Sequence, residues 1–465
     1  MHELLKMTAL ELAAAIRQRE ISSEEACRFY LSRIEQLDGG YSAFVSVLEA
    51  SALRAARGKD QKSRSTPADE LPIFHGVPLG LKDLALMRGT RTQLGSRAFR
   101  YFRAPIDAPV TKLLKRGGFV VLGKTATSEF GALPVTEPLI HAPTRNPWNS
   151  EHTPGGSSGG SGAAVAAELV PLAHGSDGGG GSVRIPAAFC HLYGFKPTHS
   201  LLGNLHGRVN TLALSTMGPL THDVADAAAM LDVMRGHPMT HRHYAQDSCL
   251  TQQALPTLRS LKIRFCTEAM IGHVEPEIAA AVESAAHILE GFGHRVEQVP
   301  MVQGRLEDFL PLWQRMLANV PSISESVLQP VTRWLRQVGR GLDHAETQRL
   351  KQVLLQRVLE FHGDADVLLT PTVGQYAPKV GAFAGLEPEA AFIAISALGS
   401  FTAPFNVTGQ PAASIPAGVS DSRLPYGVQI VGRQGRDDVV LRLSRQLEEA
   451  MPWRERSRQW NQLPR

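Results

Sequence analysis

Two stretches rich in glycine and serine, TPGGSSGGSG (153–162) and GSDGGGGS (175–182), constrain the fold more than any other feature of this chain. Such composition alone favours a flexible linker. Here the first stretch runs directly into AAVAAELVPLA, whose small residues suit a tightly packed helix. The second runs into VRIPAAF, which has β-branched and apolar character. Because linkers do not usually join buried elements so closely, we predict that both stretches are rigid loops.

Glycines in such loops can bind an anion, because positive φ angles let backbone N–H groups converge on one point. Neither loop has the GxxxxGK[ST] pattern of a nucleotide-binding loop. A developing oxyanion is the other candidate, and it makes the neighbouring serines candidate nucleophiles.

A nucleophilic serine needs a base, because its hydroxyl is scarcely ionised near neutral pH. The 17 histidines include no HExxH motif, and no GxSxG elbow marks the serine of an α/β-hydrolase. Lysine can also serve as the base, and Lys82 in VPLGLKDLAL is the lysine most closely surrounded by apolar residues, where desolvation would lower its pKa. Taken alone, a lysine in a strand-like run more often extends its amine to solvent.

The bulk properties exclude several classes of protein. A length of 465 residues predicts one large α/β unit with an inserted lobe, or two domains. The net charge is only +4 and the basic residues are scattered, so nucleic acid is not an expected partner. The four cysteines form no metal-ligand spacing, which predicts reduced thiols in a cytoplasmic protein without a metal; they are Cys27, Cys190, Cys249 and Cys266. The N-terminus indicates an amphipathic helix and not a signal sequence, and no apolar run predicts a membrane span.

Strand-like and helix-like segments alternate along the chain, which predicts α/β architecture. We expect helices at 8–19, 23–37, 108–116 and 276–290, an exposed loop at 57–70, strands at GFVVLGK, LKIRFC, GHRVEQV, DVLLTPT, PAASIP and YGVQIVG, a helix-rich region to about residue 362, and a last helix at DDVVLRLSRQLEEA.

Three motifs in the same order as in a known family give the sequence a specific resemblance. The chain strongly resembles the amidase signature family in three places. These are GVPLGLKD, the segment from TRNPWNSEHTPGGSSGGSG to GFKPT, and FTAPFNVTGQPAASIP with LPYGVQIVG. The resemblance extends from about residue 8 to 449 and implies an α/β fold, a large mixed sheet flanked by helices, with a smaller helical lobe. It implies a single amidase domain over 1–465: a signature core at 72–235, a helical lobe with a strand-helix-strand insertion at about 236–365, and strands and a helix at 366–449 that complete the core.

The resemblance also implies a Ser-cisSer-Lys triad that hydrolyses amides through an acyl-enzyme. Lys82 matches the basic lysine of the family, and Ser157 matches the bridging serine, whose preceding peptide bond is cis in relatives. Ser182 matches the nucleophile that carries the acyl group. Lys82 would take the proton of Ser157 while Ser157 takes that of Ser182.

The glycine loop before the nucleophile would form the oxyanion hole. Backbone N–H groups near Gly179, Gly180 and Gly181 would bind the oxyanion and so contact the substrate. Asp177 and Arg184 match family positions that brace this loop, and an ordinary structural salt bridge would serve equally well.

The sequence departs from the family pattern in the length of this loop. The family commonly has four steps from the aspartate to the nucleophile, whereas Asp177 and Ser182 are five steps apart. We expect a bulge within 178–180, because only glycine absorbs arbitrary φ values. Glu168 and His191 also stand where relatives often carry glycine.

The leading hypothesis is a stand-alone amidase, acting on a small-molecule amide without a metal or another cofactor. The oligomeric state stays open, with a homodimer as one option because relatives are often dimers. The alternatives are a glutaminase-type subunit of a tRNA-dependent amidotransferase and a family member that the extra glycine has made inactive. APFNVTGQPA is more similar to stand-alone amidases. Phe309, Leu312, Trp313 and Met316 form an apolar helical face, which core packing explains more readily than pocket lining.

Overall fold

The computed structural model describes residues 2–203, 212–237, 240–244, 250, 259–302, 304–322 and 324–455. Its strands are β1 (Phe44–Val47), β2 (Pro78–Lys82), β3 (Val120–Thr125), β4 (Ala173–Asp177), β5 (Tyr193–Lys196), β6 (Thr216–Thr221), β7 (Lys262–Phe265), β8 (Arg295–Gln298), β9 (Val367–Pro371), β10 (Ala412–Val419) and β11 (Pro425–Gly432).

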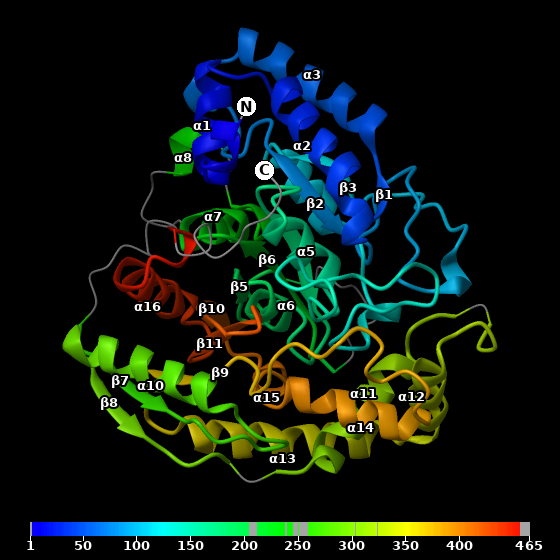
Figure 1. Cartoon of the computed structure of the whole chain (residues 1–465), viewed down its shortest axis with the longest axis vertical. Helices are drawn as coiled ribbons and strands as arrows, with labels where there is room; N and C mark the ends of the chain where they lie inside the picture. Colours follow the sequence, from blue (N-terminus) through cyan, green and yellow to red (C-terminus); the bar gives the residue numbers. More distant parts are fainter. Residues whose placement is uncertain are drawn as a thin grey trace.

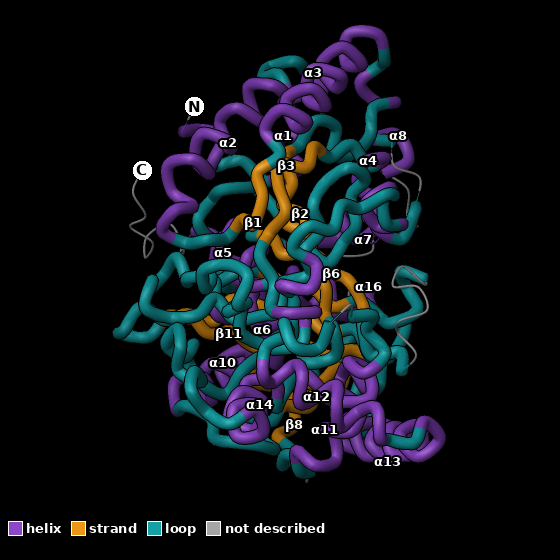
Figure 2. Tube along the Cα trace, turned by 90° about the vertical axis from the view of Figure 1, so that its right-hand side faces the viewer, coloured by secondary structure: helices purple, strands orange, loops and turns teal. Residues whose placement is uncertain are grey.

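These strands form one mixed sheet of 11 strands in the order β1-β3-β2-β4-β6-β5-β10-β11-β9-β7-β8. The pairs β2/β3, β2/β4, β7/β8 and β7/β9 are parallel and the others antiparallel. The sheet runs through the middle of the molecule, from β1 at one end to β8 at the other, with helices around it (Figures 1 and 2). The predicted α/β fold with a large mixed sheet is therefore confirmed.

The described α-helices are α1 (Ala9–Gln18), α2 (Ser23–Leu37), α3 (Glu49–Ser65), α4 (Pro109–Arg116), α5 (Gly159–Ala166), α6 (Arg184–Phe189), α7 (Val224–Met234), α8 (His241–Tyr244), α10 (Pro276–Gly291), α11 (Leu306–Ala318), α12 (Pro330–Gly341), α13 (His344–His362), α14 (Pro388–Ser396), α15 (Ala403–Val407) and α16 (Asp437–Ala450). Short 3-10 helices lie at His2–Leu5, Asp38–Gly40, Ala68–Glu70, Arg97–Phe99, Glu129–Gly131 and Ala397–Gly399.

The helices α11, α12 and α14 gather at the lower right of Figure 1, with α13 along the bottom, and form the smaller helical lobe. Their apolar side chains join one buried cluster with residues of the loops around 132–135 and 212–214. The lobe therefore packs directly on these two loops. The division of the chain at 235 and 365 stays a prediction.

Sequence signals set the first two helices accurately. Thr8 and Ser22 are the N-caps of α1 and α2, and each forms a capping box with the glutamate three residues later. Both helices begin and end within two residues of the predicted bounds.

One local expectation was wrong. The segment 57–70 is not wholly a loop, because α3 continues to Ser65. Its Lys, Arg and Gln residues are good helix formers on an exposed face, while Ala52, Leu53 and Ala56 are buried in the core that α2 shares. VRIPAAF, despite its β-branched residues, forms α6. A proline is tolerated in the first turn of a helix, and burial overrides the weak strand propensity.

The buried thiols have the character expected from the sequence. Cys27, Cys190 and Cys266 are buried and free, and Cys249 lies outside the described residues. Burial raises the pKa of Cys190, so it is a core residue and not an activated thiolate. Within the described part of the chain, no helix is both long enough and apolar enough to cross a membrane.

Candidate active site

Lys82 is the last residue of β2, and its side chain is fully buried. Its Nζ lies 2.7 Å from Ser157 Oγ and 3.1 Å from the carbonyl oxygen of Ser176. Burial lowers the pKa of Lys82 well below its usual value, and the charge of Asp177 opposes this shift only in part. The amine therefore loses its proton far more readily than an exposed lysine does.

Ser157 lies in the first glycine- and serine-rich loop, just before α5. The peptide bond between Gly156 and Ser157 is cis, as the resemblance implies. This loop passes very close to its neighbours: a Cβ on Gly156 would lie 2.7 Å from the backbone of Val135, and one on Gly160 would clash with the amide nitrogen of Ala126. The glycines are thus needed for close packing, although residues 159–162 of the predicted loop belong to α5.

Ser182 follows the second loop, between β4 and α6, and lines a pocket. Its side chain is nearly buried, with 5% of the residue exposed. Among the residues that the structure describes, its hydroxyl makes no hydrogen bond. Of the two hydrogen bonds that the predicted triad requires, the one between Lys82 and Ser157 is present, and the one between Ser157 and Ser182 is not.

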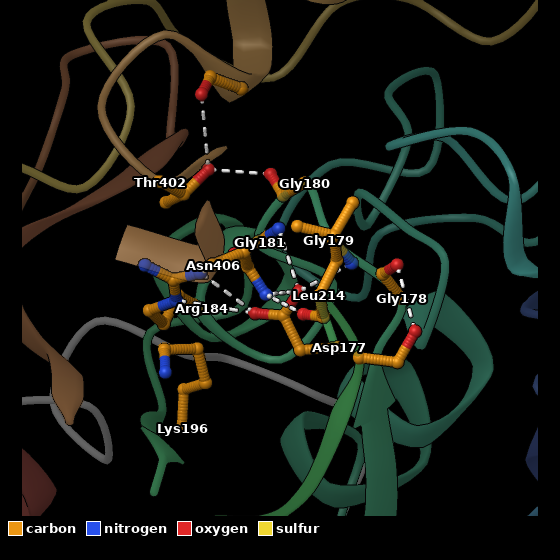
Figure 3. A network of polar contacts seen from close by, with 12 residues as sticks. Asp177, Gly178, Gly179, Gly180, Gly181, Arg184, Lys196, Leu214, Thr402 and Asn406 are labelled. Carbon is orange, nitrogen blue, oxygen red and sulfur yellow. Dashed lines mark hydrogen bonds and ion pairs between the residues drawn. The ribbon is translucent and has the colours of Figure 1, made fainter. Parts of the chain in front are cut away.

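The second loop is held by the carboxylate at its start (Figure 3). Asp177 Oδ1 accepts hydrogen bonds from the amides of Gly179 at 3.2 Å and Gly181 at 2.9 Å. From the other side, the Thr402 hydroxyl donates to the carbonyl of Gly180 at 2.6 Å. Positive φ angles occur at Gly179 (136°), within the predicted bulge, and at Gly181 (110°), beyond it.

Two of the three amides expected to bind an oxyanion therefore have an internal partner. The amide of Gly180 makes no hydrogen bond to any residue in the described part of the chain. Gly180 also lies against the helical lobe, since a Cβ there would be 3.3 Å from the Trp313 ring. The amides of Gly179 and Gly181 thus face Asp177, whereas the amide of Gly180 between them does not.

A buried polar network fixes Asp177 itself. Arg184 donates to Asp177 Oδ2 at 2.8 Å and to Gln429 Oε1 at 2.7 Å. Asn406 Nδ2 donates to Asp177 Oδ1 at 2.9 Å and to the carbonyl of Leu214 at 3.0 Å. Asp177 and Arg184 thus form the salt bridge expected between them, at 2.8 Å with both side chains fully buried.

The electrostatics of this pair keep both groups charged. Burial alone would raise the pKa of Asp177, but the charge and hydrogen bonds of Arg184 hold it below its usual value. Removing one partner of such a pair leaves a buried charge uncompensated, which typically costs about 3–5 kcal/mol.

Thr402, Asn406 and Gln429 were not singled out from the sequence, although two of the quoted motifs contain them. The sequence feature that could have identified them is an uncharged polar residue inside an apolar segment, such as Asn406 in APFNV and Gln429 in YGVQIVG. A buried polar side chain requires a partner. The identity of that partner depends on the strand order and could not be read from spacing.

The pocket beside Ser182 is lined almost entirely by apolar groups. Its described lining residues are Gly131, Ala132, Leu133, Pro134, Gly178, Gly180, Ser182, Met270, Ile271, Leu306, Phe309, Leu310, Trp313, Phe392, Ile395, Ser396, Gly399, Ser400 and Ala403. None of these carries a charge. The pocket volume of about 60 Å³ corresponds to a few water-sized positions.

The apolar face of α11 contributes both to core packing and to the lining of the pocket. Phe309 and Trp313 line the pocket, whereas Leu312 is fully buried in the lobe. Met316 is half-buried, and its sulfur lies 3.9 Å from the Ser215 hydroxyl. The less favoured interpretation, pocket lining, is therefore correct for two of the four residues.

Comparison with known proteins agrees with this arrangement. The family model described as Amidase matches residues 25–441. A putative amidase from Synechocystis sp. is 34% identical over 97% of this chain and 90% of its own length. A glutamyl-tRNA(Gln) amidotransferase subunit of Chromohalobacter salexigens is 31% identical over 96% of this chain and 97% of its own. A solved structure of 6-aminohexanoate cyclic dimer hydrolase with substrate superposes with a TM-score of 0.88 and 31% identity, covering 99% of this chain and 100% of that one.

The chain therefore belongs to the amidase signature family of amide-hydrolysing enzymes. Members of this family act on small-molecule amides, and some are components of amidotransferases.

Proposed function

We propose that this protein is an amidohydrolase that cleaves a carboxylic amide through an acyl-enzyme on Ser182, with Ser157 bridging to the base Lys82. The observation that carries the proposal is the fully buried contact of 2.7 Å between Lys82 Nζ and Ser157 Oγ, next to the pocket that Ser182 lines. Burial lowers the pKa of Lys82 well below its usual value, which favours the neutral amine that a base requires.

Each proton in the proposed reaction has a defined path. Ser182 Oγ attacks the carbonyl carbon, its proton passes to Ser157, and the Ser157 proton passes to Lys82. When the carbon–nitrogen bond breaks, Ser157 gives its proton to the leaving amine and regains one from Lys82. A water molecule then uses the same relay to hydrolyse the ester on Ser182.

The oxyanion of this reaction needs donors in the glycine loop. The amide of Gly180 is the one that meets no internal acceptor among the described residues, so we assign it first. The amides of Gly179 and Gly181 would contribute only by leaving Asp177 Oδ1. Their oxyanion role stays a prediction, as does closure of the hydrogen bond between Ser157 and Ser182 when substrate binds.

The lining of the pocket favours a substrate with an uncharged, apolar substituent. Burying an unpaired charge against side chains such as Phe309 and Trp313 would be strongly unfavourable. The name of the structural relative, a hydrolase of the cyclic dimer of 6-aminohexanoate, is compatible with this preference. Aliphatic and aromatic amides are the proposed substrate class.

The same lining weighs against the glutaminase alternative. Free glutamine carries an ammonium and a carboxylate, and no described lining residue bears a complementary charge. The inactive-enzyme alternative rests on the extra glycine and on the unbonded Ser182 hydroxyl. A homodimer and a cytoplasmic location stay predictions from the sequence.

Labelling with an alkyl fluorophosphonate tests the proposed nucleophile. We expect one adduct, located on Ser182 by peptide mass spectrometry, because a serine activated by a base attacks phosphorus much faster than an ordinary hydroxyl does. The Ser182→Ala variant should remain unlabelled while unfolding with the cooperativity of the wild type. A principal adduct on another serine would contradict the assignment, and the absence of an adduct in folded protein would support the inactive-enzyme alternative.

Shortening Trp313 tests the proposed substrate class. In Trp313→Ala, kcat/KM for a hexanoyl 4-nitroanilide should fall about tenfold more than for the acetyl compound, because the longer chain loses apolar contact area. Leu386→Ala, at a residue 47% exposed and outside the pocket lining, is the control and should leave this ratio unchanged. Equal losses for both substrates would mean that Trp313 supports the glycine loop without contacting the chain.

A further inference from the structure

A second hollow, separate from the active-site pocket, is lined by four arginines. Arg54 reaches it from α3, and Arg88, Arg91 and Arg103 from the loop after β2. The other lining residues are Ser46, Leu48, Ser51, Met87, Gly89 and Thr90. The hollow has a volume of about 540 Å³, contains no acidic lining residue and shares no described lining residue with the active-site pocket.

Two of these arginines are fixed by a small antiparallel ladder. The Ala104 amide donates to the carbonyl of Thr90 at 2.9 Å, and the Thr92 amide donates to the carbonyl of Phe102 at 3.1 Å. Between these bonds Arg91 and Arg103 form an antiparallel bridge directly opposite each other. Both side chains are exposed, whereas Thr90 and Ala104 point inward and are buried.

This arrangement places like charges together without compensation. Arginines directly opposite each other on neighbouring strands repel, which destabilises the pair. In the described part of the chain none of the four lining arginines forms an ion pair with a carboxylate. The nearby Asp107 binds Lys115 at 2.8 Å and the backbone amide of Arg88 at 2.8 Å.

We propose that this hollow is a binding site for a phosphate-bearing anion with two or more negative charges. Planar guanidinium groups donate paired hydrogen bonds to phosphate oxygens, and here they come from α3 and from both sides of the ladder. A bound anion would remove the repulsion between Arg91 and Arg103. The ladder fixes the backbone of both arginines, so binding requires only their exposed side chains to turn, including Arg103, whose Nη1 donates to the Gly89 carbonyl at 3.2 Å.

Calorimetric titration of the full-length protein with sodium tripolyphosphate tests the proposal. We expect saturable binding at one site, weakened by added salt, and a rise in the melting temperature of the protein. The double variant Arg91→Gln/Arg103→Gln should bind at least about tenfold more weakly. It should fold normally, because it removes a repulsive pair from an exposed face, so its unliganded melting temperature should match or exceed that of the wild type.

The control variant has the same change in net charge as the double variant, but its substitutions lie outside the hollow. Arg97→Gln/Arg100→Gln alters two exposed arginines of the same loop that do not line the hollow, and it should bind like the wild type. Flotation with vesicles of phosphatidic acid, whose phosphate monoester can carry two negative charges, in phosphatidylcholine distinguishes a lipid headgroup from a free phosphate, and it must show the same dependence on Arg91 and Arg103. No binding of either probe, or equal weakening in both double variants, would overturn the proposal.

Discussion

The Lys82→Met variant is expected to lose about a thousandfold or more in kcat for amide hydrolysis. The same variant should also lose the contribution of Lys82 to the pH dependence of the free energy of unfolding. Methionine fills a similar volume but cannot accept the Ser157 proton, and a general base typically contributes about 100- to 10,000-fold. In the wild type, kcat/KM should fall as the pH falls through the lowered pKa of Lys82, because the protonated amine cannot act as a base.

The stability effect has a defined sign. The folded pKa of Lys82 is lowered, so between that value and the ordinary lysine value of about 10.5 the unfolded chain binds more protons than the folded one. The wild type therefore gains stability as the pH rises through this window, by at most about 1.4 kcal/mol per pH unit. The variant lacks this gain, so its stability relative to the wild type should be highest near neutral pH and should decline toward pH 10.

Urea unfolding of both proteins between pH 7 and pH 10 measures the difference directly. Lys112→Met, at an exposed position on α4, is the matched control and should run parallel to the wild type. Parallel curves for Lys82→Met and the wild type would mean that Lys82 keeps its proton in the folded protein. The proposed base would then be wrong, whatever the loss of activity.

Sequence reasoning reached the fold class because its signals were local. The helical periodicity at 8–19 and 23–37 and short apolar runs such as GFVVLGK depend on neighbours along the chain. The three motifs then indicated which segments form the core. The extent of α3 and the helical state of VRIPAAF depend instead on which surfaces become buried, and propensity alone cannot supply that information.

The candidate site likewise has one part that the sequence predicted and one part that it did not. The resemblance identified Lys82 and Ser157, which the structure brings into contact across 75 residues of sequence. It could not give the orientation of the amides in a loop one residue longer than the family pattern, because that orientation depends on the bonds of Asp177 to two amides of the loop and of Thr402 to one of its carbonyls. The φ angles of Glu168 (55°) and His191 (56°) supply a physical reason for glycine at these positions in relatives.

The packing of Thr402 on the glycine loop leads to a second large expected effect, at Gly181. Alanine there would drive its Cβ into both Oγ1 and Cβ of Thr402, far inside van der Waals contact. The φ angle of 110° is also unfavourable for any residue with a side chain. Thr402 cannot move away easily, because it is fully buried and holds the carbonyl of Gly180.

The loop should therefore move in Gly181→Ala, and Ser182 is the next residue. A displacement near 1 Å in an active site costs about 100-fold in rate, so we expect at least that loss in kcat and in fluorophosphonate labelling of Ser182, in protein that still unfolds cooperatively. Gly435→Ala is the matched control. Gly435 also has a positive φ angle, of 78°, but no atom lies within 4 Å of its added Cβ, so this variant should keep full activity.

A second variant separates the clash from the backbone strain. Adding Thr402→Gly to Gly181→Ala removes the clashing Cβ but also the hydrogen bond to Gly180, so labelling should recover only in part. If Gly181→Ala retained wild-type kcat, the loop would be free to relax without moving Ser182. The amide orientations around Asp177 would then not control the nucleophile, and the extra glycine would be a neutral insertion.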